Sequence, residues 1–157
     1  MWALAAVSGS CFVLLLDQTG SRRLDVFGAS MTSAGPGEAM SRGDAAALAR
    51  AVLLRLDDAN RTGNYSIFRS MAAPDFQKMN TVEDLQRIFS WLRTAQLPLS
   101  SAAWLGPDSL SPVVIENDGL LHVRGALPNV PGGMSFDLLM QQVDSQWLVF
   151  GVAVYRG

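Results

Sequence analysis

The sequence predicts one α+β domain in which three N-terminal helices pack on one face of an antiparallel sheet. Two observations predict this fold class. From residue 41 to residue 92 apolar residues recur every three to four positions, the period of helices with one buried face. From about residue 101 onward, short apolar segments are separated by turn sequences such as NDG and PNVPGG, as in an antiparallel meander. Helices followed by a meander are typical of an α+β domain.

The first helix is expected to begin at Ser41, because Asp44 stands three residues later, as in a capping box. Gly63 is expected to end it, since glycine adopts the left-handed backbone of a helix C-terminus without steric cost. The residues between them have one apolar stripe, which predicts a helix that faces a core. That stripe consists of Leu48, Val52 and Leu56, widened by Ala45, Ala49 and Leu53.

Two further helices are expected before the sheet. Residues 64–72 predict a short helix that ends at Pro74, which cannot continue it. A third helix is expected to begin at Thr81, with Asp84 completing the capping box, and to end before Pro98. The buried sides of these helices are expected to consist of Ile67, Phe68 and Met71 in the first, and of Val82, Leu85, Phe89 and Leu92 in the second.

Five strand-like segments follow, at residues 101–106, 111–117, 120–127, 134–143 and 146–155. The NDG sequence at 117–119 suits a three-residue hairpin loop with its glycine in the left-handed conformation. This loop predicts that Glu116 pairs with Leu120 and that Val114 pairs with His122.

The predicted register decides which way His122 points. Residues paired across two strands share a face, so His122 and Arg124 are expected on the outer face of the sheet, next to Glu116. The opposite register would move both polar side chains into the core, at a high cost in desolvation. We therefore expect His122 to be an exposed surface residue and not a catalytic one. The buried face is expected to consist of Val113, Ile115, Leu121, Val123 and Leu127.

The last strand is apolar on both faces, which predicts a cover for its second face. We therefore expect a homodimer that forms through the outer face of the sheet. The candidate interface residues are Glu116, His122, Arg124, Trp147, Val149 and Tyr155. In the alternative, neighbouring side chains shield a single exposed tryptophan, and no interface exists.

Composition excludes several classes of function. The chain has 157 residues, a net charge of -2 and no basic run, which disfavours a nucleic-acid-binding role. One cysteine and one histidine are a poor set of ligands for zinc, so no metal site is predicted. No glycine-rich nucleotide-binding pattern and no G-x-S-x-G motif occurs, so neither a cofactor nor a serine nucleophile is predicted.

The N-terminal part is expected to be a leader and a linker. Residues 1–16 are apolar and uncharged, and their length fits the hydrophobic region of a signal peptide or a short anchor. Residues 17–43 are rich in glycine and serine, which indicates a flexible linker. The folded domain then covers residues 44–157. We expect a periplasmic, secreted or membrane-tethered protein that meets the membrane only through this leader, or else a loosely packed N-terminal segment.

Two segments carry a family resemblance. The sequence NRTGNYSIFRSMAAPDF at 60–76 and the closing sequence QWLVFGVAVY resemble the nuclear transport factor 2-like superfamily, over roughly residues 44–156. The resemblance implies a curved, cone-like sheet. That superfamily includes ketosteroid isomerase and SnoaL-like proteins. The position that matches the oxyanion-binding tyrosine of the isomerases is Leu56, and residues 77–80 contain no match for their general base. No catalytic residue is therefore predicted.

The resemblance also implies a cavity between the helices and the sheet. Aromatic and methionine side chains suit a small apolar ligand. The candidate lining residues are Phe68, Phe89, Trp91, Trp104, Phe136 and Met140. In the alternative these side chains simply fill the core. The sequence thus favours a non-enzymatic extracytoplasmic module, either for assembly or for holding a ligand. An isomerase-like or SnoaL-like enzyme with unidentified catalytic residues is the second possibility.

Overall fold

A computed structural model describes residues 40–156 of the chain and confirms the α+β class. The predicted leader, and the predicted linker as far as residue 39, lie outside the described residues. The expected extracytoplasmic location therefore stays a prediction. Among residues 40–156, no helix combines the length and the apolar character needed to cross a membrane.

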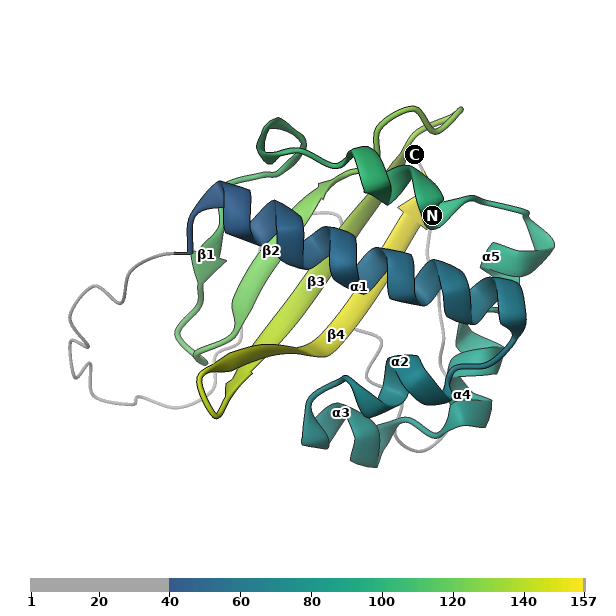
Figure 1. Ribbon diagram of the computed structural model, residues 1–157, viewed down its shortest axis with the longest axis horizontal. Coiled ribbons are helices and arrows are strands. Elements are labelled where there is room, and N and C mark those ends of the chain that lie inside the picture. Colours follow the sequence, from purple (N-terminus) through teal and green to yellow (C-terminus); the bar gives the residue numbers. More distant parts are fainter. Residues whose placement is uncertain (1–39, 157) are drawn as a thin grey trace.

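The described part contains helices α1 (Arg42–Thr62), α2 (Ser66–Ser70), α3 (Pro74–Met79), α4 (Val82–Ile88) and α5 (Ser90–Thr94). Two 3₁₀ helices follow, η1 (Leu99–Trp104) and η2 (Pro107–Ser109). Strands β1 (Val114–Ile115), β2 (Leu121–Ala126), β3 (Met134–Val143) and β4 (Gln146–Arg156) form an antiparallel sheet in the order β1-β2-β3-β4. α1 crosses one face of this sheet, and α2 to α5 gather beyond β4 at the C-terminal end of α1 (Figure 1).

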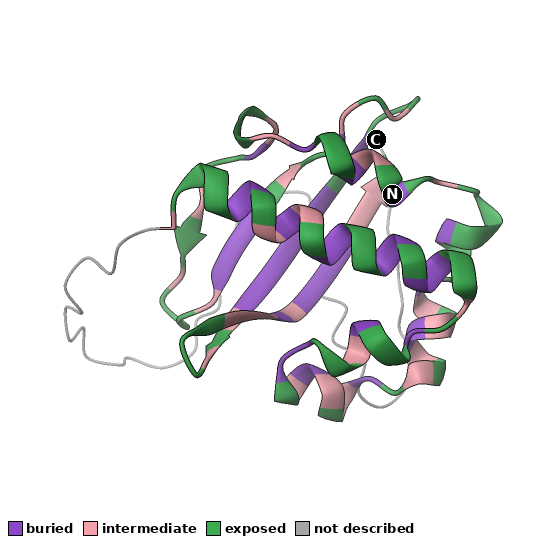
Figure 2. Cartoon of the chain, viewed as in Figure 1, coloured by how far each residue is buried: buried purple, intermediate pink, exposed green. Residues whose placement is uncertain are grey.

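The first helix agrees with its sequence signals. Ser41 Oγ accepts a hydrogen bond from the Asp44 amide at 3.1 Å, and Gly63 ends α1 with φ 71°. The predicted apolar stripe of α1 belongs to one hydrophobic core that includes β2, β3 and β4. Figure 2 shows the buried residues on α1 and along these three strands. Apolar periodicity was sufficient to place this helix because its packing partner is a single broad face.

The second predicted helix shortens to α2 and is followed by a helix that was not predicted, α3, whereas the third predicted helix divides in two. Pro74 does not end the second helix but begins α3, at a first-turn position where its missing N–H is not needed. α2 is therefore only five residues long, and it buries Phe68 while Ile67 and Met71 are exposed. The prediction that Ile67 and Met71 are buried is wrong. The third helix begins with the predicted capping box of Thr81 and Asp84 and divides into α4 and α5 at Phe89.

The strand predictions hold for the centre of the sheet and fail at its edge. Residues 101–106 mostly belong to the 3₁₀ helix η1 instead of a strand, and only two residues of the 111–117 segment form β1. Leu121, Val123 and Leu127 are buried as predicted, whereas Ile115 is exposed. β1 is a short edge strand, so its side chains have a neighbouring strand on one side only.

A β-bulge changes the predicted faces of β4. Leu139 of β3 lies opposite Gly151, but Met140 lies opposite Val149, so Phe150 is the additional residue of the bulge. Alternation is interrupted there, and every residue of β4 before the bulge takes the face opposite to the predicted one. Val149 is consequently buried in the core, on the same side as Met140.

Gly125 marks the closest approach between the sheet and the preceding loop. A Cβ atom at this position would lie 2.5 Å from the Ser109 carbonyl oxygen and 2.9 Å from Phe136 Cζ. Leu110 forms a β-bridge with Gly125, and the Ser111 amide donates to the Arg124 carbonyl at 2.9 Å. The end of η2 is therefore held directly against β2.

We predict that Gly125→Ala lowers the free energy of unfolding by about 1–3 kcal/mol, because backbone atoms must move to admit one methyl group. Urea denaturation followed by circular dichroism measures the change. Gly106→Ala is the matched control, since a Cβ at Gly106 meets no atom within 4 Å. Equal effects of the two substitutions would contradict this account.

Candidate functional site

His122 lies on the face of the sheet opposite α1, in the predicted register. It pairs with Val114 of β1 and with Leu139 of β3. The prediction that His122 is exposed is wrong, because the residue is only 2% exposed. Its neighbours Leu121 and Val123, which point to the other face, are buried too, so the first half of β2 is covered on both sides. The alternation of residues along β2 predicts the face on which His122 lies, but it does not predict that this face is buried at His122.

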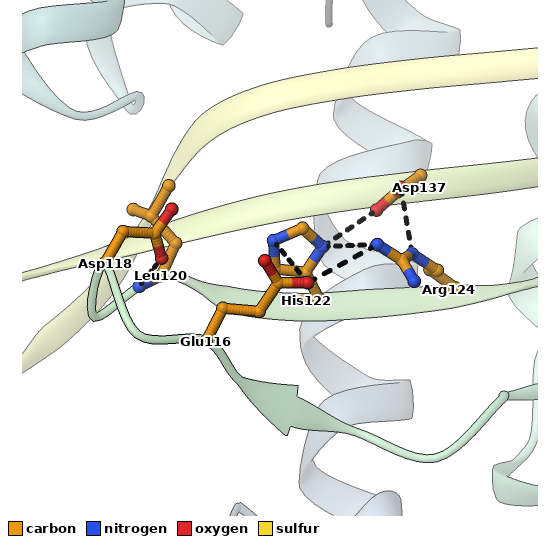
Figure 3. A network of polar contacts seen from close by, with 6 residues as sticks. All are labelled: Glu116, Asp118, Leu120, His122, Arg124 and Asp137. Carbon is orange, nitrogen blue, oxygen red and sulfur yellow. Dashed lines mark hydrogen bonds and ion pairs between the residues drawn. The ribbon is translucent and has the colours of Figure 1, made fainter. Parts of the chain in front are cut away.

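A hydrogen-bonded network of charged side chains surrounds the imidazole ring (Figure 3). Arg124 Nε donates to Asp137 Oδ2 at 3.0 Å, and Arg124 Nη2 lies 2.9 Å from His122 Nδ1. Asp137 Oδ1 lies 3.8 Å from the same Nδ1. Glu116 Oε1 lies 3.5 Å from His122 Nε2 and 3.7 Å from Arg124 Nη2. We call Glu116, His122, Arg124 and Asp137 the His122 network.

Local structure explains why these four residues meet. His122 and Arg124 are two positions apart on β2 and so share a face, and Arg124 lies directly opposite Asp137 of β3. Glu116 is brought in by the predicted NDG turn. The Glu116 amide donates to the Leu120 carbonyl at 3.0 Å, and Gly119 has the predicted left-handed backbone, with φ 78°.

The contact with Arg124 favours one tautomer of His122. A guanidinium group has donors and no acceptor, so the contact with Arg124 Nη2 requires a lone pair on His122 Nδ1. The proton of the neutral ring is then on Nε2, which faces the Glu116 carboxylate. In this arrangement the Nδ1 lone pair is already engaged, and the ring cannot take a proton from a substrate without losing its contact with Arg124.

The structure separates the residues that were predicted to form an interface. Glu116, His122, Arg124 and Tyr155 lie on or beside the outer face, where Tyr155 is opposite Ser135 of β3. Trp147 lies opposite Gln142 and, like Val149, packs against the core on the helix side. The predicted six-residue surface is therefore not one surface, because the bulge turns the first part of β4 over.

The predicted lining of a ligand cavity also divides into two groups. Phe68, Phe89, Phe136 and Met140 are buried in the common core. Trp91 and Trp104 are 38% and 77% exposed, so their assignment to an internal lining is wrong. The sequence predicts a strand at Trp104, whereas this residue is the last of η1, which packs against α1.

Three buried polar residues at the C-terminal end of α1 were missed by sequence reasoning. Tyr65 is fully buried, its hydroxyl donates to Asn60 Oδ1, and its ring stacks on Phe89. Asn60 Nδ2 is buried and makes no hydrogen bond. Asp57, one turn earlier on α1, accepts a hydrogen bond from the Leu99 amide at 3.0 Å. The available signal in the sequence was that two polar residues, Asp57 and Asn60, lie three positions apart next to the apolar stripe of α1.

The described residues offer no group of three or more His, Cys, Asp or Glu side chains that could hold a metal ion. Comparisons of the chain with protein-family models, with curated proteins and with solved structures found no match. The resemblance to the nuclear transport factor 2-like superfamily therefore stays a prediction.

We predict that Tyr65→Phe lowers the free energy of unfolding by about 1–3 kcal/mol near neutral pH, because Asn60 Oδ1 loses its donor in a buried setting. Burial raises the pKa of the Tyr65 hydroxyl above its usual value of 10.0. Its contribution is therefore complete below about pH 10 and declines as the pH rises further, since the unfolded chain ionises first.

The measurement is urea denaturation of both proteins from pH 7 to pH 11. The double variant Asn60→Leu/Tyr65→Phe is the control, because removal of both partners leaves no buried acceptor without a donor. A double variant that is less stable than Tyr65→Phe would contradict this interpretation, as would a difference between wild type and Tyr65→Phe that grows above pH 10.

Proposed function

We propose that the protein is a non-enzymatic accessory or assembly module that forms a homodimer through an apolar surface on α1 and η1. The observation that carries this proposal is the exposure of Trp104, the largest exposed fraction among the bulky apolar residues of the described part. Tryptophan is enriched among the residues that dominate binding energy at protein interfaces. We call Trp104 and Leu54, which is also exposed, the α1–η1 surface.

The surrounding structure holds Trp104 in position. At the start of η1, the Leu99 amide donates to Asp57 of α1, and just after its end Arg50 Nη1 donates to the Leu105 carbonyl at 2.8 Å. Leu54 lies between these two anchors along α1. A backbone segment that is already held at both ends loses little conformational freedom when a partner covers its side chains, which favours binding.

The His122 network supports a binding role more than a catalytic one. The only histidine of the chain has its Nδ1 lone pair engaged by Arg124. The outer face of the sheet supports dimerisation less well than the α1–η1 surface does. Its central residues His122, Asp137 and Leu139 are already buried within one chain, so a second copy has little left to cover there.

We predict that Trp104→Ser raises the dissociation constant of the dimer about thirtyfold, the effect of losing about 2 kcal/mol at an interface hot spot. Sedimentation velocity over a series of concentrations measures it. Trp91→Ser is the control, since it removes an exposed tryptophan from α5. A wild-type chain that stays monomeric at every concentration would refute the dimer. Equal effects of both substitutions would refute the role of the α1–η1 surface.

One observation favours a second candidate, isomerase-like proton transfer next to a carbonyl group. A tyrosine hydroxyl and a carboxylate, those of Tyr65 and Asp57, are buried near Asn60 at the same end of α1. Such groups can stabilise an oxyanion and move a proton when a substrate reaches them.

This candidate predicts that the wild-type protein catalyses deuterium incorporation next to the carbonyl of cyclohexanone in heavy water. Tyr65→Phe and Asp57→Asn should each abolish the catalysed rate, whereas Asp58→Asn, at an exposed neighbouring position, should retain it. Mass spectrometry of the ketone measures the exchange. A rate equal to that of buffer alone would refute the candidate.

A further inference from the structure

We propose that the His122 network is a pH-sensitive switch. When His122 is protonated, its Nδ1 loses the contact with Arg124 Nη2 and donates a hydrogen bond to Asp137. Arg124 Nη2 then binds Glu116 instead. The β1–β2 turn is then tied more tightly to the sheet at acidic pH than at neutral pH. The switch is independent of the dimer surface proposed above, since it uses none of the residues of the α1–η1 surface.

The first step follows from the donors and acceptors in the neutral state. Arg124 cannot give up a proton, so its contact with His122 lasts only while Nδ1 carries a lone pair. A protonated imidazole carries a hydrogen on both nitrogens. Two N–H groups on two cations would then face each other across 2.9 Å, and this contact must break.

The second step uses an acceptor that is already in place. Asp137 Oδ1 is buried and accepts no hydrogen bond, and it lies 3.8 Å from His122 Nδ1. Asp137 Oδ2 keeps its hydrogen bond with Arg124 Nε. A small movement therefore lets Asp137 bind both cations, one through each oxygen. In the neutral state one of the two buried carboxylate oxygens of Asp137 has no hydrogen-bond donor, so a new donor to this oxygen favours the rearrangement.

The third step involves Glu116 and the mobility of Arg124. The side chain of Arg124 is 44% exposed, whereas that of His122 is 3% exposed, so the arginine is the partner that can move. Glu116 Oε1 lies 3.7 Å from Arg124 Nη2 and can receive it. Protonation thus converts two carboxylates facing one cation into a closed ring of two carboxylates and two cations.

The charged groups that face the ring of His122 can be given strand by strand for the described residues. They are Glu116 after β1, Arg124 on β2 and Asp137 on β3. The β4 residues at the same level are Gly151 and Ala153, which carry no charge, and Tyr155 lies further along, opposite Ser135. Of these groups, imidazole is the one whose charge ordinarily changes between about pH 5 and pH 8.

The experiment uses the full chain labelled with ¹⁵N, in which one histidine gives one pair of ring nitrogens without an assignment problem. Long-range ¹H–¹⁵N spectra should show the Nε2–H tautomer at pH 8. Through the midpoint of the histidine titration, the Arg124 guanidinium signals should shift. Amide exchange of Glu116 and Gly119, corrected for intrinsic rate, should slow about twofold to fivefold, the effect of one partly exposed ion pair.

Three results would overturn the switch. They are an Nδ1–H tautomer at pH 8, no protonation of His122 between pH 5 and pH 8, and a titration that leaves the Arg124 signals unchanged. Two variants add a test. Arg124→Met should raise the share of the Nδ1–H tautomer at pH 8, because Nδ1 then loses the donor Arg124 and still lies near the acceptor Asp137 Oδ1. Glu116→Gln should abolish the change in amide exchange, while Glu83→Gln, at an exposed position on α4, should retain it.

Discussion

The pairing of β3 with its two neighbours is the constraint on which the rest of the structure depends. It places Asp137 opposite Arg124 on one side and opposite Ala153 on the other. Because side chains alternate along a strand, the same pairing sends Leu138 into the core and leaves Leu139 on the outer face. The bulge between Leu139 and Met140 then decides the face of Val149 and Trp147. A shift by one residue would exchange both faces together.

The outer face is unusual because ionisable side chains are buried on it. Removing a carboxylate such as Asp137 from water is costly unless cations and hydrogen-bond donors replace the solvent. Arg124 provides that replacement through its hydrogen bond to Asp137 Oδ2, while Asp137 Oδ1 lies 3.8 Å from His122 Nδ1. Buried charged groups of this kind contribute little net stability. They do impose one arrangement of strands, since any other register would leave a buried charge without its partner.

The helical side is held together by polar anchors on α1 as well as by its apolar stripe. Arg42 donates to the Leu110 carbonyl, Arg50 donates to the Leu105 carbonyl, and Asp57 accepts from the Leu99 amide. These three contacts attach the whole segment of η1 and η2 along α1. Such contacts satisfy backbone groups at the ends of η1 and η2, which the short 3₁₀ helices leave without a partner. Within this attached segment Leu99 and Ala102 are buried in the core, whereas Trp104 at the end of η1 is exposed.

The sequence by itself determined the α+β class, the limits and buried face of α1, the capping box at Thr81 and the hairpin register that pairs Val114 with His122. All of these depend on neighbours within a few residues along the chain, so periodicity and turn chemistry contain them. Only the tertiary structure decided that His122 is buried among Glu116, Arg124 and Asp137, that Trp104 is exposed, and that Val149 belongs to the core. Each of these depends on a contact between distant segments or on a bulge, and neither leaves a periodic signal in the residues themselves.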